Sequence, residues 1–418
     1  MGRGVSDIMD SKLRSNVDHI VASAIRAVLP DEAVRRSLSD RRFSGRVILV
    51  AAGKAAWQMA KAAKTCLGEQ IYAGVVVTKY GHVMGPIDGL MCCEAGHPIP
   101  DENSFSGTRK ALDLVSGLTQ EDTVLFLLSG GGSALFEMPL VPGEELQDIT
   151  GQLLACGADI VEINTIRKRL SAVKGGRFAQ ACAPAQVFSV VLSDILGDPL
   201  DMIASGPAVP DLSTCAQAEA IAQKYSLKLS EAARDLLRGE TPKALSNVTT
   251  VITGSVRELC AAAANACREL GYEPMILTDR LCCQAKEAGS FLASILTTHA
   301  NAGKKMAFIA GGETVVRVTG KGKGGRNQEL ALAAAPGISG IPGAAVFSVG
   351  SDGTDGPTDA AGGYCDHETD AALKEMGIDV FCVLQNNDAY HALERVDGLI
   401  ITGPTGTNVN DVAVALLG

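Results

Sequence analysis

The stretch VILVAAGKAAWQMAKAA, residues 47–63, decides the fold of this chain. It opens with apolar residues only, passes through Gly53 and Lys54, and continues into an alanine-rich segment of helical character. A short, wholly apolar run indicates a strand that is buried on both faces, and a strand followed directly by a helix is the repeating unit of a parallel sheet. The stretch therefore predicts an α/β fold.

The same pattern recurs through the first part of the chain. The runs AGVVVTK, TVLFLL and VFSVVLSD, at residues 73–79, 123–128 and 187–194, alternate with segments of helical periodicity. Buried strands that alternate with helices are typical of a doubly wound sheet covered by helices on both faces. Residues 1–240 are therefore predicted to form an N-terminal, Rossmann-like domain with a mostly parallel sheet.

Residues 241–418 are predicted to form a second, C-terminal α/β domain with a mixed sheet. A polar segment, RGETPKALSN, marks the boundary, and VTTVITG, a helix over 256–270 and EPMIL then predict a βαβ unit. Farther along, TVVRVT alternates apolar and polar residues. This alternation predicts an antiparallel strand that pairs with MAFIA in a hairpin.

Composition excludes several classes of protein. The 418 residues carry a net charge of -10 without any block of Lys or Arg, which argues against a nucleic-acid partner. No apolar run approaches the ~20 residues that span a membrane. The 12 cysteines form no CxxC motif, and some are adjacent, as in Cys92 and Cys93. This usage is typical of reduced thiols and predicts a cytoplasmic protein.

A glycine loop follows the apolar run at 123–128. It consists of Ser129, Gly130, Gly131, Gly132 and Ser133. Consecutive glycine amides can point one way and bind an anion, Ser133 adds a hydroxyl, and Lys54 would supply positive charge. The alternative is a tight turn that binds nothing. The loop is not a Walker motif, because GxxxxGK[ST] occurs nowhere in the chain.

A second glycine-rich segment, GKGKGGRNQE, contains the pattern GxGxxG at Gly320, Gly322 and Gly325. As a dinucleotide fingerprint this pattern should follow a buried strand and open a helix. A helix is predicted from about Asn327, but the preceding segment has the alternation of a half-exposed strand, which weakens the dinucleotide interpretation. Arg326 and Asn327, at the start of the helix, suit the capture of a carboxylate or phosphate.

Two further loops carry polar candidates. SDGTDGPTDAAGG follows the apolar run AAVFSV and contains Asp352, Asp355 and Asp359. Their spacing does not match a calcium loop, but Mg²⁺ held by one or two carboxylates and phosphate oxygens is compatible with it. A solvated surface turn is the alternative. His97, in the proline-stiffened AGHPIP, is a candidate for positioning substrate or for a structural role in its loop.

Motifs along almost the whole chain resemble, in order, those of the type II glycerate kinases, or glycerate 2-kinases. The motifs are AAGKAAW, VVVTKYGH, AGHPIPDENS, LLSGGGSALFE, NTIRKRLSAVKGGR, VLSDILGDPLDMIASGP, GGETVVRV, GGRNQELAL, SDGTDGPTDAAGG and TGPTGTNVND. The resemblance implies phosphorylation of D-glycerate on its 2-hydroxyl by ATP with Mg²⁺, giving 2-phospho-D-glycerate. It also implies two α/β domains, a C-terminal MOFRL region over about 300–412, and an active site in the cleft between the domains.

Phosphoryl transfer needs positioning, charge neutralisation and an activated acceptor, and these motifs supply candidates for each. The catalytic candidates are Lys54, Asp194 and Arg326, with Asp194 expected to orient or deprotonate the 2-hydroxyl. The candidates for binding substrate or phosphate are Ser129, Gly130, Gly131, Gly132, Ser133, His97, Asn327 and Asn408. The candidate Mg²⁺ ligands are Glu313, Asp352 and Asp355. Which glycine loop holds ATP and which holds glycerate is left open by the spacing.

Two other functions remain open at this stage. Sequences of this kind also carry the name hydroxypyruvate reductase, and the GxGxxG pattern would fit a nicotinamide cofactor. A non-catalytic sensor of sugar acids or nucleotides is less favoured, because Lys, Asp, Arg and glycine loops are expected to converge from both halves of the chain. The expected partners are D-glycerate and ATP, with no nucleic acid or membrane and a possible homo-oligomer.

Overall fold

The computed structural model describes residues 5–418 and divides into two compact units. The N-terminal unit comprises Pro30–Ser193 and Asp198–Thr253. The C-terminal unit comprises the chain up to Leu29, Asp194–Gly197 and Gly254–Gly418. These units differ from the predicted division after residue 240. The first helix and the 194–197 loop belong to the C-terminal unit, and residues 241–253 belong to the N-terminal unit.

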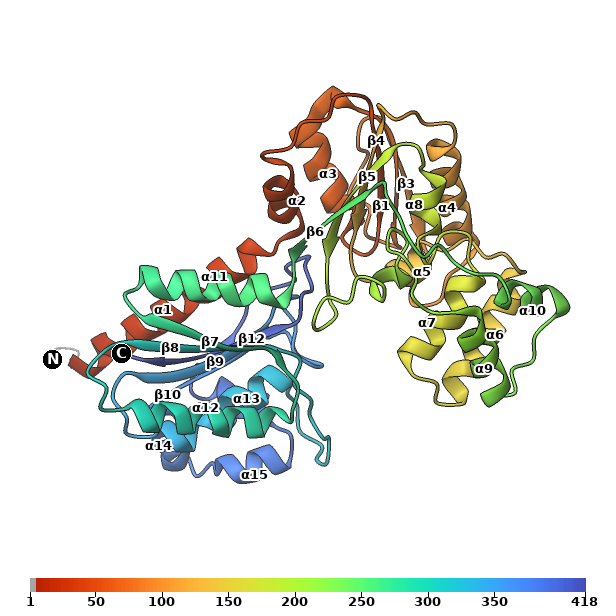
Figure 1. The fold of residues 1–418 in the computed structure, drawn as a ribbon. Coiled ribbons are helices and arrows are strands. Elements are labelled where there is room, and N and C mark those ends of the chain that lie inside the picture. Colours follow the sequence, from red (N-terminus) through yellow and green to blue (C-terminus); the bar gives the residue numbers. More distant parts are fainter. Residues whose placement is uncertain (1–4) are drawn as a thin grey trace. The chain divides into compact units, whose positions relative to one another are not determined.

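The N-terminal unit contains a six-stranded sheet in the order β3-β2-β1-β4-β5-β6 (Figure 1). Its strands are β1 (Val47–Ala52), β2 (Ile71–Lys79), β3 (Leu90–Ala95), β4 (Thr123–Leu128), β5 (Gln186–Leu192) and β6 (Val248–Gly254). The ladders that join β3, β2, β1, β4 and β5 are all parallel. The predicted doubly wound, mostly parallel sheet is confirmed.

Helices cover this sheet and form a separate helical part. Around the sheet lie α2 (Pro30–Leu38), α3 (Ala56–Leu67), η1 (Gly68–Gln70), α4 (Glu102–Val115), α5 (Gly132–Leu135), α8 (Arg177–Ala181) and η2 (Ile203–Ser205). The helical part consists of α6 (Gly143–Ala155), α7 (Ile160–Arg169), α9 (Cys215–Lys224) and α10 (Glu231–Leu237). It has a hydrophobic core of its own, which includes Ile149, Ile166 and Leu237.

The C-terminal unit contains a mixed six-stranded sheet in the order β11-β10-β9-β12-β8-β7. Its strands are β7 (Glu273–Leu281), β8 (Met306–Gly312), β9 (Ala344–Gly350), β10 (Gly362–Asp366), β11 (Leu399–Ile400) and β12 (Asp411–Leu417). Only the β7–β8 ladder is parallel. The mixed sheet was expected, but two local predictions were wrong. The strands β6 and β7 belong to different sheets and form no βαβ unit, and β8 pairs with β12 and β7 rather than with TVVRVT.

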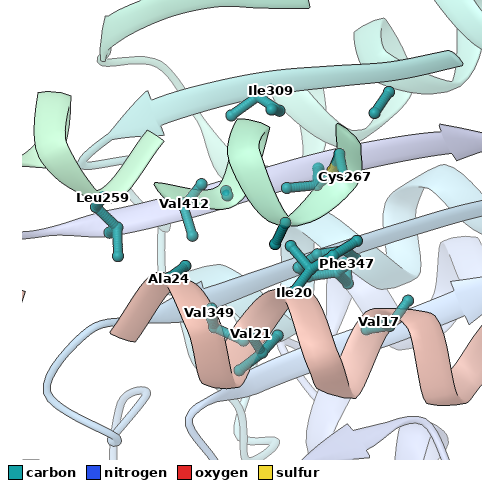
Figure 2. Close-up of a cluster of buried hydrophobic side chains, with 14 of the residues drawn as sticks. Val17, Ile20, Val21, Ala24, Leu259, Cys267, Ile309, Phe347, Val349 and Val412 are labelled. Carbon is teal, nitrogen blue, oxygen red and sulfur yellow. The ribbon is translucent and has the colours of Figure 1, made fainter. Parts of the chain in front are cut away.

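Helices cover both faces of the C-terminal sheet. They are α1 (Val5–Ala27), α11 (Val256–Glu269), α12 (Ala285–His299), α13 (Arg326–Ile338), α14 (Thr369–Glu375), α15 (Val380–Gln385) and α16 (Ala389–Glu394). Alternate side chains of β12 serve the two faces: Val412 and Val414 pack with α1 and α11 (Figure 2), whereas Ala413 and Ala415 pack with α12 and α13. This alternation explains why β12 is apolar along its whole length after Asp411.

Two further facts concern the whole described chain. No helix within residues 5–418 combines the length and the apolar character needed to cross a membrane. All 12 cysteines are free thiols.

Candidate functional site

The N-terminal sheet has one topological switch point, between β1 and β4. From β1 the strand order runs outward through β2 and β3, and from β4 it runs the other way through β5 and β6. Ligands of doubly wound sheets bind in the crevice at the carboxyl ends of the strands on either side of such a point. Here those strand ends lead into Gly53 and Lys54 and into the loop Ser129–Ser133.

Hydrogen bonds from the backbone of the first loop hold the two loops at the switch point together. The main-chain N–H of Lys54 donates to the Gly130 carbonyl at 2.9 Å, and that of Ala55 donates to Ser129 Oγ at 3.0 Å. Gly53 has a φ of +125°, and a β-carbon there would overlap Ser129. Ser129 is buried and its hydroxyl holds the neighbouring loop. The contacts therefore favour a supporting role for Ser129, whose predicted contact with substrate stays a prediction.

Three of the predicted site residues meet beside this pair of loops. A β-carbon on Gly131, whose φ is +85°, would lie 3.0 Å from His97 Cδ2 and 3.2 Å from Lys54 Cγ. Partial burial and the positive charges of Lys54 and Lys79 lower the pKa of His97. A neutral imidazole beside a lysine and a glycine-rich backbone forms a site with donors for an anion. Lys54, His97 and Gly131 are therefore neighbours in the folded N-terminal unit and form one candidate site.

Two cations, neither of them predicted from the sequence, support the glycine loop. Lys174 is fully buried and donates to the carbonyls of Ser133 at 2.9 Å and Phe136 at 3.2 Å. Arg167 donates to the same Ser133 carbonyl at 2.9 Å, and both cations pair with the buried Glu137. Burial lowers the pKa of Lys174 to about 8, against the opposing charge of Glu137. The only available signal was the cluster of basic residues in NTIRKRLSAVKGGR.

Alanine at Gly131 tests whether the glycine loop contacts a ligand. Because an L-residue at this φ costs about 1–2 kcal/mol, Gly131→Ala will lower stability by that amount. The new methyl group will also crowd Lys54 and His97, so we expect kcat/KM to fall about tenfold or more. The matched control is Gly117→Ala, where φ is +74° but a β-carbon meets nothing within 4 Å. If both variants lose the same activity, strain alone explains the effect.

The C-terminal unit contains a cavity of about 740 Å³ around Arg326, at the start of α13. The guanidinium donates two hydrogen bonds to Asp411, through Nε at 2.6 Å and Nη2 at 3.0 Å, and one to Glu313 at 2.8 Å. Burial alone would lower the pKa of Arg326, but the hydrogen bonds and charge of Asp411 raise it above its usual value. Arg326 is therefore charged and held in one orientation at the cavity wall.

Asn410 and Asp411 were not among the predicted site residues. Asn410 has a φ of +67° and donates from Nδ2 to Glu313 at 3.2 Å. Its Oδ1 is buried and accepts no hydrogen bond from any described residue. The predicted residue was instead Asn408, which is exposed and accepts from the Asn410 main chain. The signal in TNVND was a polar pair at the start of a buried strand, since Asn410 precedes β12 and Asp411 is its first residue.

Asp355 and Asn327 have structural contacts that the sequence did not indicate. Asp355 accepts hydrogen bonds from the main-chain N–H groups of Asn327 at 3.1 Å and Gln328 at 2.9 Å, and so caps α13. Burial raises the pKa of Asp355 to about 6. Asn327 is itself buried and accepts from Ser348 at 2.6 Å. These contacts favour support of the cavity wall for both residues, and their predicted direct roles stay predictions.

The three predicted metal ligands do not form a cluster of their own. Asp352 and Asp355 line the cavity with Glu313, but within residues 5–418 no group of three or more His, Cys, Asp or Glu side chains is arranged to hold a metal ion. Asp352 Oδ1 accepts from the Thr354 main chain at 2.9 Å. The arrangement fits an ion whose ligands come mainly from a phosphorylated substrate, with one or two carboxylates added.

Family models cover both units. Residues 16–238 match a domain of unknown function, DUF4147, and residues 306–411 match the MOFRL family. The chain is 54% identical over 404 residues to the D-glycerate 2-kinase of Thermotoga maritima, an alignment that covers 95% of this chain and 97% of that protein. The chain belongs to the glycerate kinase family. The predicted family membership is confirmed.

A solved structure and a second relative extend the comparison within the glycerate kinase family. The crystal structure of a Thermotoga maritima glycerate kinase superposes with a TM-score of 0.93 at 53% identity, over 98% of this chain and 100% of that chain. A relative from Agrobacterium vitis carries a hydroxypyruvate reductase name and is 37% identical over 98% of this chain and 95% of its own length. Names within the family therefore cover two different reactions.

The GxGxxG pattern of this glycerate kinase family member does not form a dinucleotide loop. A β-carbon on Gly320 or Gly322 would overlap the segment 386–388, and one on Gly325 would overlap Asp355. The glycines are thus explained by close packing against the chain itself. The segment also follows no strand directly, because β8 ends at Gly312.

The last catalytic candidate, Asp194, lies in the 194–197 loop, which groups with the C-terminal unit. Leu196 of this loop lines the cavity that also contains Arg326 and Glu313. Asp194 therefore lies two residues from the cavity wall. Lys54 belongs to the N-terminal unit, and the expectation that Lys54 and Arg326 share one active site stays a prediction.

Proposed function

We propose that this protein transfers the γ-phosphoryl group of ATP to the 2-hydroxyl of D-glycerate, giving 2-phospho-D-glycerate and ADP. The observation that carries the proposal is the meeting of Lys54, His97 and Gly131 at the switch point of the N-terminal sheet. The similarity to a protein named D-glycerate 2-kinase, over nearly its whole length, supports the same reaction.

Each polar group has a place in such a reaction. Lys54 would neutralise charge on the transferred phosphoryl group, and the glycine loop would position its oxygens. Arg326, held by Asp411 and Glu313, would bind the glycerate carboxylate or the phosphoryl group. Asp352 and Glu313 would complete the coordination of Mg²⁺, which neutralises phosphate charge when bound.

The direct test is an assay of the purified protein on two substrate pairs. D-glycerate with MgATP should give ADP and a product that ³¹P NMR identifies as 2-phosphoglycerate. Hydroxypyruvate with NADH or NADPH should give no oxidation of the cofactor, because the packed glycines of 320–325 offer no dinucleotide loop. Turnover of hydroxypyruvate without glycerate phosphorylation would establish the reductase instead. A product phosphorylated at the 3-position would retain the kinase and correct the acceptor atom.

Asp194 is the proposed base or orienting group for the 2-hydroxyl. Asp194→Asn keeps the shape of the side chain but removes its basicity, so kcat should fall about 10²–10⁴-fold while the melting temperature changes little. Activity should be measured across a Mg²⁺ series, because partial recovery at high Mg²⁺ would assign a metal-ligand role. The control is Asp235→Asn, an exposed carboxylate of α10. Full activity of Asp194→Asn at every Mg²⁺ concentration would remove Asp194 from the mechanism.

Two wider expectations belong to the same proposal. The free thiols and the class of reaction favour a location in the cytoplasm, where thiols are kept reduced and ATP is available. The expected ligands are D-glycerate and ATP, and assembly into a homo-oligomer stays possible. Sedimentation of the purified protein would measure its assembly state.

A further inference from the structure

We propose that the cavity between α7 and α9 in the N-terminal unit binds the adenine and ribose of ATP. The proposal rests on the proposed kinase function and decides which glycine loop serves the nucleotide. The cavity has a volume of about 530 Å³, within the 300–1,000 Å³ that is typical of small-molecule sites.

The walls of this cavity are apolar at the rim and suit a flat, neutral ring. Val161 and Leu212 line it and are 54% and 85% exposed, and Met202 and Ile221 also line it. Large aliphatic side chains with this exposure are costly unless something covers them. A purine placed among them would remove apolar area of both partners from water.

The charges of the cavity are paired with each other. The Lys168 side chain is 5% exposed and its Nζ lies 3.2 Å from Asp211 and 3.4 Å from Asp201. Lys224, which also lines the cavity, pairs with Glu162 at 2.6 Å. The lining has three carboxylates and two lysines, so it leaves no positive charge free for a phosphate and suits the neutral nucleoside part of ATP. Asp201, whose side chain is 46% exposed, can accept hydrogen bonds from ribose hydroxyls, the role that a carboxylate has in many nucleotide sites.

The same elements connect this cavity to the glycine loop. Met202 lines the cavity, and two residues later Ala204 Cβ lies 2.8 Å from the position of a β-carbon on Gly132. On α7, Lys168 and Thr165 line the cavity while Arg167 donates to the Ser133 carbonyl. A nucleoside in the cavity would therefore direct its phosphates along 202–204 toward the glycine loop and Lys54.

The cavity of the C-terminal unit is a poorer match for a nucleotide. Its lining includes four carboxylates, Glu313, Glu329, Asp352 and Asp355. Its one arginine, Arg326, already donates to Asp411 and Glu313. These carboxylates suit the Mg²⁺ of MgATP rather than its base and ribose, whereas the positive charges of Lys54 and Lys79 attract the phosphates. The charges thus assign the nucleotide to the N-terminal unit.

Filling the cavity tests the assignment directly. Ala220 lines it from the exposed face of α9, so Ala220→Trp would occupy the space of the base without disturbing a core. We expect the Kd for MgADP, measured by calorimetry without glycerate, to rise at least tenfold, and KM for ATP to rise in parallel. KM for D-glycerate and the melting temperature should remain near wild type. The matched control is Ala232→Trp, at an exposed alanine of α10.

Two further variants make the result decisive. Leu212→Ser should weaken MgADP binding at least threefold, whereas Leu154→Ser, at another exposed leucine, should not. Val318→Trp fills the C-terminal cavity, and weakened MgADP binding in that variant with unchanged binding in Ala220→Trp would overturn the inference. A wild-type protein that binds MgADP in an Ala220-sensitive manner but phosphorylates no glycerate would overturn the proposed function and leave the nucleotide site in place.

Discussion

Replacing Lys54 with alanine will lower kcat for glycerate phosphorylation by about 10²–10³-fold, because the variant loses a positive charge that meets the developing charge of the transition state. The fold should tolerate the change. The Lys54 backbone is fixed by its own N–H bond to Gly130 at 2.9 Å, and its carbonyl accepts from Thr78 at 3.2 Å. The measurement is kcat and both KM values beside a melting curve.

The control for this variant lies on the next helix. Lys61 is an exposed lysine of α3, so Lys61→Ala should leave kcat unchanged. Lys54→Arg restores the charge but not the compact ammonium, and it should recover only part of the rate. A folded Lys54→Ala protein with kcat within threefold of wild type would show that the positive charge at the switch point takes no part in the reaction.

Arg326→Lys should lower kcat about 100-fold or more, although it keeps the charge. The forked guanidinium meets Asp411 through two nitrogens and Glu313 through a third, at 2.6–3.0 Å. A lysine offers one nitrogen on a flexible stem and cannot hold all three bonds. Stability should fall by about 2 kcal/mol, since a buried carboxylate loses part of its hydrogen bonding.

Measuring kcat and the melting temperature of the same variant distinguishes a catalytic role of Arg326 from a structural one. A variant with a lower melting temperature and wild-type kcat would make Arg326 a structural residue only. Asp411→Asn provides the comparison, because it frees Arg326 from one charge while keeping an acceptor. If Arg326 acts by its orientation, both variants should lose kcat. The control is Arg268→Lys, at an exposed arginine of α11.

The sequence predicted the parts of this protein that are local and missed those that depend on tertiary pairing. The strand and loop at 47–54 were predictable because a buried parallel strand is apolar throughout and a helix follows at once. The βαβ prediction over 248–277 failed because the apolar pattern of EPMIL is equally compatible with a strand of either sheet. The supports of the glycine loop, Lys174 and Arg167, were not predictable, since their partners are main-chain carbonyls whose position depends on the fold.

The candidate site residues also include some whose surroundings the sequence indicated and some whose contacts depend on the fold. Lys54, His97 and Gly131 were each chosen for their chemistry, and the fold brings them together. Asp355 was chosen as an acid in a glycine-rich turn, but its contacts are with the helix start that begins at Arg326. A single carboxylate in a turn looks the same in sequence whether it caps a helix or binds an ion.

The position of β12 means that the sheet of the C-terminal unit cannot be completed until this strand has been synthesised. This strand lies between β8 and β9 in the middle of its sheet, yet it is the last of the sheet's strands to leave the ribosome. Until then β8 and β9 lack the neighbour that joins them, and α1, which is made before every strand of this sheet, lacks part of the surface on which it packs. Asp411, the partner of Arg326, is the first residue of that strand. A nascent chain that stops before it has neither a continuous sheet nor the ion pair between Arg326 and Asp411, so the arrangement around Arg326 arises only after β12 has been made.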